Sequence, residues 1–210
     1  MEEKKLTPKE SMELIASMIQ CTKRRVVSPD LRISVMWGLL VIATAAVAWF
    51  LLSSTHNPWF NLIWFAIPVI GIPVNIVLAN GKREKGGTKT YVDAVSEAVW
   101  KCVGYIAVGL TVICFIAQQC GCPMAWLAMF YYAFIVVGFG ATVSGLLLRE
   151  KSYVFGGMFS IFSGFAVIVC NLCRVTLLYS WVVPLYILCF LLMFIVPAFI
   201  ISRKIKASEK

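Results

Sequence analysis

Cysteine is the residue type whose number and spacing offer the most chemistry in this sequence. Four of its eight cysteines form two close pairs, Cys120-Gly-Cys122 and Cys170-Asn-Leu-Cys173. If both pairs lie at one oxidising membrane face, they could form disulfides or pass electrons, as membrane thiol oxidoreductases do. The other four are scattered, as expected where cysteine is a small apolar filler. Redox chemistry, a structural disulfide and inert thiols are therefore three open interpretations of Cys120, Cys122, Cys170 and Cys173.

A second candidate site is a broken-helix pattern within one apolar stretch. Pro68, Gly71 and Pro73 precede Asn75 there. Prolines free backbone carbonyls in a membrane helix, and these carbonyls together with the Asn75 amide could line a polar cavity. Kinks that only improve helix packing are the alternative. We therefore treat Pro68, Pro73 and Asn75 as a candidate cavity for a small solute.

Other kinds of chemistry have no support in the residue pattern. All ten carboxylates fall in polar tails, loops or a helix approach, whereas ion-coupled carriers usually hold their ion with an intramembrane Asp, Glu or His. The single histidine, His56, has only Thr55 and Asn57 beside it, which are poor metal ligands. Phosphate-binding, zinc-protease and serine-hydrolase motifs do not occur in the sequence. We expect no catalytic residues, no metal site, no cofactor and no enzymatic activity.

The elements that position these residues are membrane helices. The chain is 60% apolar and 14% charged, against about 45–50% and about 25% in soluble domains. A hydrocarbon core about 30 Å thick requires roughly 20 apolar residues in a helix. Six stretches approach this length, at about residues 33–52, 59–79, 102–117, 124–147, 153–173 and 182–201. We expect an all-α polytopic membrane protein, a six-helix transmembrane bundle of three hairpins over residues 33–203.

Basic residues indicate the orientation of this bundle. Lys and Arg in short connections remain on the cytoplasmic side of a membrane. Of the 19 basic residues, 18 fall in the two tails and the second and fourth connections, and only Arg174 falls on the other side. We expect both termini, including the tail 204–210, in the cytoplasm and the chain in the inner (plasma) membrane. The net charge of +9 then reflects topology, with the lipid bilayer as partner and no nucleic acid.

Tryptophan positions agree with the same span ends. Six of the seven lie near the ends of the expected helices, as in the aromatic belts of membrane proteins. Only Trp64 lies about one turn deeper. The third helix should also begin before its apolar part, because Tyr91, Val95 and Val99 already keep helical spacing.

Residues 1–32 are the one sizeable segment expected outside the membrane. Thr7-Pro8-Lys9-Glu10 has the residue types of a helix N-cap, its first turn and a capping box. An apolar stripe at helical spacing follows, formed by Leu14, Ile15, Met18 and Ile19. We expect a cytoplasmic amphipathic helix that lies along the membrane surface. Docking onto a cytoplasmic protein partner or a second copy of the chain is the alternative.

Small residues recur at helical spacing in the fourth and fifth expected spans. Such stripes allow close approach of helix backbones, either inside the bundle or between two copies. The helix-packing candidates are Gly140, Ser144, Gly156, Ser160 and Gly164.

Several short motifs together resemble a group of small bacterial multi-pass membrane proteins of unknown function. These motifs are Leu6-Thr-Pro-Lys-Glu-Ser11, Trp37-Gly38, Asn57-Pro-Trp59 and Lys89-Thr-Tyr-Val-Asp93. The resemblance implies a similar membrane topology and supplies no activity or functional residues. The leading hypothesis is a non-enzymatic structural, regulatory or partner-binding bundle. A solute carrier or channel using the kinked second span, and a thiol redox protein, are the alternatives.

Overall fold

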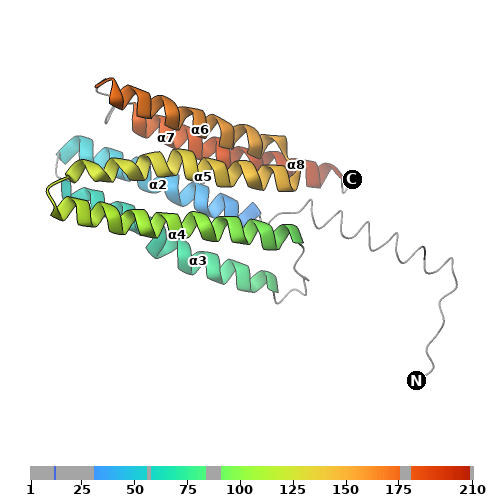
Figure 1. Cartoon of the computed structure of the whole chain (residues 1–210). Coiled ribbons are helices and arrows are strands. Elements are labelled where there is room, and N and C mark those ends of the chain that lie inside the picture. The colour runs from blue at the N-terminus through green and yellow to red at the C-terminus, as the bar shows by residue number, and fades with distance from the viewer. Residues whose placement is uncertain (1–11, 13–30, 56–57, 84–90, 176–180, 209–210) are drawn as a thin grey trace.

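The computed structural model describes residues 12, 31–55, 58–83, 91–175 and 181–208, and over these ranges the chain is helical apart from short turns between helices and has no strand (Figure 1). Six helices are long and apolar enough to cross a membrane. The all-α six-helix bundle expected from the sequence is therefore confirmed. Its elements are α2 (Leu31–Thr55), η1 (Pro58–Phe65), α3 (Ala66–Arg83), α4 (Tyr91–Gln119), η2 (Pro123–Trp126), α5 (Leu127–Leu148), α6 (Lys151–Leu172), α7 (Val182–Phe190), η3 (Leu191–Ile195) and α8 (Val196–Ser208).

The observed helices match the expected spans with two refinements. α4 begins at Tyr91, so the third helix does start before its apolar part, as its spacing indicated. The second span begins with the 3₁₀ segment η1, whose first residue is Pro58. The first N–H groups of a helix have no partner inside it, and proline suits this position because it has no N–H. The N-terminal stripe Leu14, Ile15, Met18 and Ile19, and the expected amphipathic helix, lie outside the described residues.

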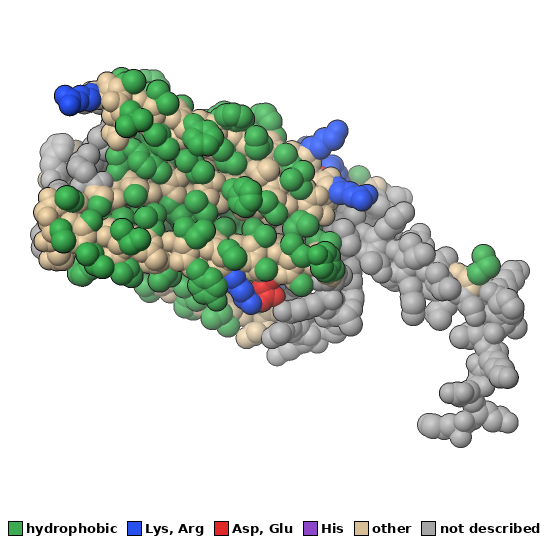
Figure 2. All heavy atoms as spheres, viewed as in Figure 1, with side chains coloured by type: hydrophobic (Ala, Val, Ile, Leu, Met, Phe, Trp, Pro, Cys, Tyr) green, Lys and Arg blue, Asp and Glu red, His purple; other side chains and the backbone are tan. Residues whose placement is uncertain are grey.

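The six spans run roughly parallel to one another, and the start of α2 and the end of α8 lie at the same end of the bundle (Figure 1). A span of 22 residues such as α5 is about 33 Å long, which suffices for a hydrocarbon core of about 30 Å. Figure 2 shows apolar side chains along the sides of the bundle and basic side chains mainly at its ends. This distribution is the one that a lipid environment favours.

The core is built around α5, α6 and the sixth span. Three helices in sequence, α7, η3 and α8, form that last span (Val182–Ala207). Its middle part, η3, is a π-helix in which the Val196 N–H bonds to the Leu191 carbonyl. Pro197 follows directly, and because proline has no N–H and its ring clashes with the carbonyl four residues earlier, it disfavours a regular α-helix through this turn.

Two glycines make room for the wider π-helical turn. A Cβ at Gly156 of α6 would lie 2.7 Å from the Leu192 carbonyl carbon and 3.0 Å from the Met193 nitrogen. A Cβ at Gly38 of α2 would lie 2.7 Å from Phe194 Cβ. The π-helix is therefore enclosed by two neighbouring helices at positions where only glycine fits without a shift.

Candidate functional site

The two cysteine pairs lie in turns that end helices at the same end of the bundle. After α4, Gly121 has a φ of 85° and the Cys122 N–H bonds to the Ala117 carbonyl at 2.9 Å. After α6, the left-handed position is taken by Arg174, at a φ of 55°, with a 2.9 Å bond from the Val175 N–H to the Cys170 carbonyl. Both are Schellman-type helix ends, so the backbone around each pair is fixed by its own hydrogen bonds.

No disulfide bond links these four cysteines in the structure. Cys120, Cys122, Cys170 and Cys173 are all free thiols, and three of them are exposed. α5 packs against both α4 and α6 and lies between the helices that carry the two pairs (Figure 1). Among the described residues, no three His, Cys, Asp or Glu side chains gather as metal ligands. The thiols are placed for access from the surface, and the redox interpretation is left without a paired geometry to support it.

The second span has few buried residues in its contact with the bundle. Gly71 is buried against α2, where a Cβ would lie 2.5 Å from the Trp37 ring. Pro68 and Pro73 are both exposed. The two prolines therefore contribute to the outer surface of α3, and only the third candidate cavity residue, Asn75, is half-buried.

Asn75 carries the one polar side chain in the middle of α3, one turn beyond Gly71 on the same side of the helix. No hydrogen bond joins its amide to any other described residue. An amide carries two donors and an acceptor, and in hydrocarbon it lacks the water that would satisfy them. Asn75 is thus a polar group at membrane depth without an internal partner among the residues that the structure describes.

α5 and α6 form the most extensive helix contact in the bundle, and small residues of both helices take part in it, whereas Gly140 and Ser144 of α5 face α4. All five predicted packing residues, Gly140, Ser144, Gly156, Ser160 and Gly164, are buried. Ser160 Oγ donates a 2.8 Å hydrogen bond to the Phe134 carbonyl, and a Cβ at Gly164 would lie 2.8 Å from Phe134 Cβ. Gly156 instead contacts η3. The small residues along α6 therefore pack against both α5 and the sixth span. Because these residues are covered within one chain, they are not available for contact between two copies.

Gly138 also contributes to this contact, and the sequence analysis missed it. A Cβ at Gly138 would lie 3.0 Å from the Gly157 carbonyl oxygen. Gly138 lies seven residues before Gly145, which is buried against Val154 of α6. That spacing of two helical turns is the signal that could have identified it.

Polar side chains between α4 and α5 also form hydrogen bonds within the bundle. Trp100 Nε1 donates to Ser144 Oγ at 3.1 Å, and Tyr132 Oη donates to the Val103 carbonyl at 2.8 Å. Near the cysteine end, Cys114 Sγ bonds to the Ala125 carbonyl at 3.2 Å. The first two contacts hold α4 to α5, and the third joins α4 to η2 (Pro123–Trp126). The polar groups therefore act as helix connectors.

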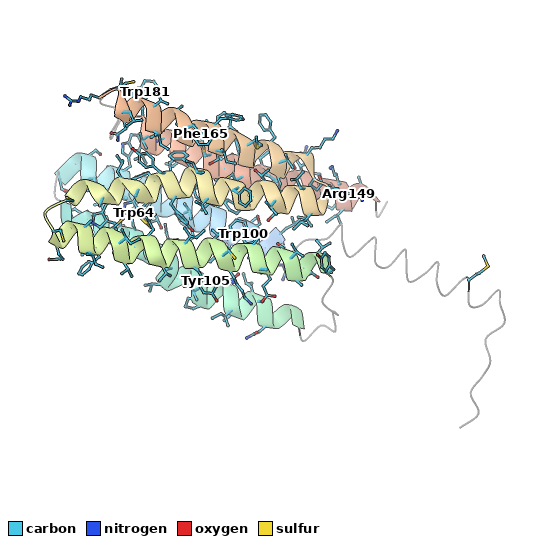
Figure 3. All side chains as sticks on the ribbon, viewed as in Figure 1. Trp64, Trp100, Tyr105, Arg149, Phe165 and Trp181 are labelled. Atoms are coloured by element: carbon cyan, nitrogen blue, oxygen red, sulfur yellow. The ribbon has the colours of Figure 1, made fainter. Side chains whose placement is uncertain are left out.

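A column of aromatic rings follows the sixth span, and the sequence analysis did not anticipate it. Ring centroids are 5.8 Å apart for Trp64 and Tyr186, 4.6 Å for Tyr186 and Phe190, 5.7 Å for Phe190 and Phe194, and 5.8 Å for Phe194 and Trp100. Figure 3 shows Trp64 and Trp100 well separated along the bundle. The i, i+4, i+8 spacing of Tyr186, Phe190 and Phe194 was the available signal. Phe130 and Phe134 join the column at Tyr186.

Comparisons with protein-family models, with curated proteins and with solved structures found no match for this chain.

Proposed function

We propose that this protein is a non-enzymatic membrane scaffold that binds a protein partner through its second span. The supporting observation is the Asn75 amide, which has no hydrogen-bond partner among the described residues, on a span that these residues cover little. Only 6% of the α3 span is buried, compared with 50% of the α5 span. We place the scaffold in the bacterial inner membrane, with both termini in the cytoplasm.

The surroundings of Asn75 favour a protein partner over lipid. Lipid chains can cover the exposed Ile72 and Ile76 of α3, but they offer no hydrogen bond to an amide. A transmembrane helix of a partner, bearing a polar side chain or an open backbone carbonyl, would satisfy Asn75 while covering its apolar neighbours. Polar side chains in membranes contribute about 0.6 kcal/mol on average, and at most about 1.7 kcal/mol, to such helix contacts.

A photo-crosslinking residue in place of Ile72 tests this proposal. Ile72 is 52% exposed and lies three residues from Asn75 on the same side of α3. We expect a discrete protein adduct from this position, weakened when Asn75→Leu is added, because leucine keeps the volume and removes the amide.

The matched control carries the same crosslinker at Phe162 of α6, which is 63% exposed. We expect lipid adducts alone from that position. Protein adducts of equal yield from both positions, or an Ile72 adduct that is indifferent to Asn75→Leu, would contradict the proposal. Lipid adducts alone from both positions would also contradict the proposal. The alternative that Asn75 lines a cavity for a small solute would then be favoured.

The N-terminal stripe Leu14, Ile15, Met18 and Ile19 offers a second contact in this proposal. An apolar stripe on a basic segment suits either the membrane surface or a protein groove. Deleting residues 1–32 separates the two contacts: loss of the Ile72 adduct would show that the partner needs the N-terminal segment, and retention would locate its binding on α3.

A further inference from the structure

A dense group of cations lies at the end of the bundle where α5 turns into α6 and α8 ends. Its members are exposed, and all belong to the described part of the chain: Arg149, Lys151, Arg203, Lys204 and Lys206. Glu150 is the carboxylate among them, and its Oε2 lies 2.6 Å from Lys204 Nζ. We name these five cations the basic end patch.

The backbone and one ion pair hold this patch in place. Arg149 occupies a left-handed position, with a φ of 55°, in a Schellman turn closed by the bond from the Glu150 N–H to the Gly145 carbonyl. Glu150 begins α6, but its side chain makes no capping bond to the helix and bonds to Lys204 instead. The α5–α6 turn and α8 are thereby tied together, so cations from two parts of the sequence are presented side by side.

Exposed rings lie one helical turn below two of these cations. On α8 the Arg203 guanidinium lies 4.5 Å from the centre of the Phe199 ring, and Phe199 is 58% exposed. On α6 Phe155 follows Lys151 by four residues and is 65% exposed. Figure 3 shows Arg149 at the very end of the bundle. Each helix therefore presents a cation close to the end of the bundle and an aromatic ring one turn further from that end, an arrangement that suits a lipid headgroup and its acyl chains.

We propose that the basic end patch is a binding site for the phosphate headgroup of an anionic phospholipid, with its acyl chains packed on the exposed rings of α6 and α8. Charge complementarity supports this occupant, because five clustered cations face one carboxylate that Lys204 already neutralises. The topology rule explains why basic residues lie at this end of the bundle, but it does not require them to be joined by an ion pair or placed above rings.

Thermal unfolding of the full chain in a neutral detergent, titrated with phosphatidylglycerol or phosphatidylcholine, tests the site. We expect phosphatidylglycerol to raise the Tm saturably and phosphatidylcholine to have little effect. Each of Lys151→Gln and Arg203→Gln should raise the half-saturating phosphatidylglycerol concentration about fivefold at low salt, since each cation near the surface adds attraction to anionic lipid. Lys151→Gln removes charge without touching the Arg203–Phe199 contact, so it distinguishes lost binding from lost packing.

Arg174→Gln is the control, because Arg174 is exposed at the opposite end of the bundle. We expect this variant to titrate like the native chain. Equal stabilisation by phosphatidylcholine, or equal weakening by Arg174→Gln, would overturn the proposal. Stabilisation by inorganic phosphate at the same concentration would also overturn it, since it would indicate a site for free anions.

Discussion

At the scale of single residues, glycines on different helices of the bundle meet opposite surroundings. Gly104 of α4 has no atom within 4 Å of the place where a Cβ would stand. Gly156 of α6 has the backbone of Leu192 and Met193 there, which cannot rotate away as a flexible side chain would. The same residue type is therefore replaceable at one site and required at the other.

Gly156→Ala should destabilise the bundle, because the new methyl group pushes α6 away from the π-helical turn. Overpacking of this kind costs about 1–3 kcal/mol. We expect a loss of that size in the free energy of unfolding, measured by denaturation in mixed micelles with increasing SDS.

Gly104→Ala is the matched control for this substitution. A helix-interior alanine is favoured over glycine by about 0.5–1 kcal/mol, so this variant should be neutral or slightly more stable. Equal effects of the two substitutions would show that α6 and η3 are not in close contact.

At the scale of elements, α4 is attached to α5 by polar side chains more than by a glycine contact. Trp100 and Ser144 form one of these links at 3.1 Å, near the end of the bundle that carries the basic end patch. Ser144 also donates to the Gly140 carbonyl at 2.8 Å, so its hydroxyl remains satisfied when the indole is removed. The link can therefore be broken without leaving a buried hydroxyl unpaired.

A double-mutant cycle of Trp100→Phe and Ser144→Ala measures this link. We expect a coupling free energy of about 0.6–1.7 kcal/mol, the range of hydrogen bonds between membrane helices. Trp181→Phe, at a tryptophan that is 71% exposed, should show no coupling to Ser144→Ala. A coupling near zero for Trp100 would mean that its ring acts only through its contact with Phe194.

The elements themselves were largely predictable, because a membrane helix must be apolar over its whole length. That requirement marks α2, α5 and α6 directly and gives their ends to within a few residues. The π-helix was not predicted. Pro197 indicates an interrupted helix, but whether a kink, a 3₁₀ turn or a π turn results depends on the space that Gly38 and Gly156 leave on other helices.

The candidate sites were predictable only as residue types. Spacing could identify Ser160 and Gly164 as packing residues, because one helix face is a local property. It could not show that Pro68 and Pro73 are exposed while Gly71 carries the contact with α2, because that depends on which neighbour the helix meets. Trp100 shows the same limit: its position suggested a membrane-interface belt, and its indole N–H is instead used within the bundle.

At the scale of the whole molecule, the cysteine turns and the basic end patch occupy opposite ends of the bundle. The cysteine pairs lie at the C-terminal ends of α4 and α6, whereas Arg149 follows the C-terminal end of α5 at the other end of the bundle, as Figure 3 shows. A transmembrane chain with this arrangement exposes Cys120 and Cys173 on one side of the membrane and Lys206 on the other. The native thiols therefore report both the orientation and the redox state of the protein.

Single-cysteine variants of the full chain test the orientation. We expect a membrane-impermeant maleimide to label a variant that retains only Cys120, or only Cys173, from outside intact spheroplasts. A cysteine-free chain carrying Lys206→Cys should need permeabilised membranes, because the proposed orientation puts its thiol on the cytoplasmic side. The reverse pattern would invert the orientation, and equal labelling of all three in intact cells would contradict a transmembrane bundle.

The same reagent decides between the interpretations of the cysteine pairs. If all four thiols are free in the native chain, as they are in the structure, labelling from outside should equal the summed labelling of the single-cysteine variants that retain Cys120, Cys122, Cys170 or Cys173. A disulfide within Cys120-Gly-Cys122 or Cys170-Asn-Leu-Cys173 would remove two labels that dithiothreitol restores, since only the thiolate reacts with maleimide.

Because each pair lies at a Schellman-type helix end with its own backbone hydrogen bonds, we expect no increase in labelling on reduction. Replacing all four cysteines by serine should likewise leave mobility on non-reducing gels unchanged.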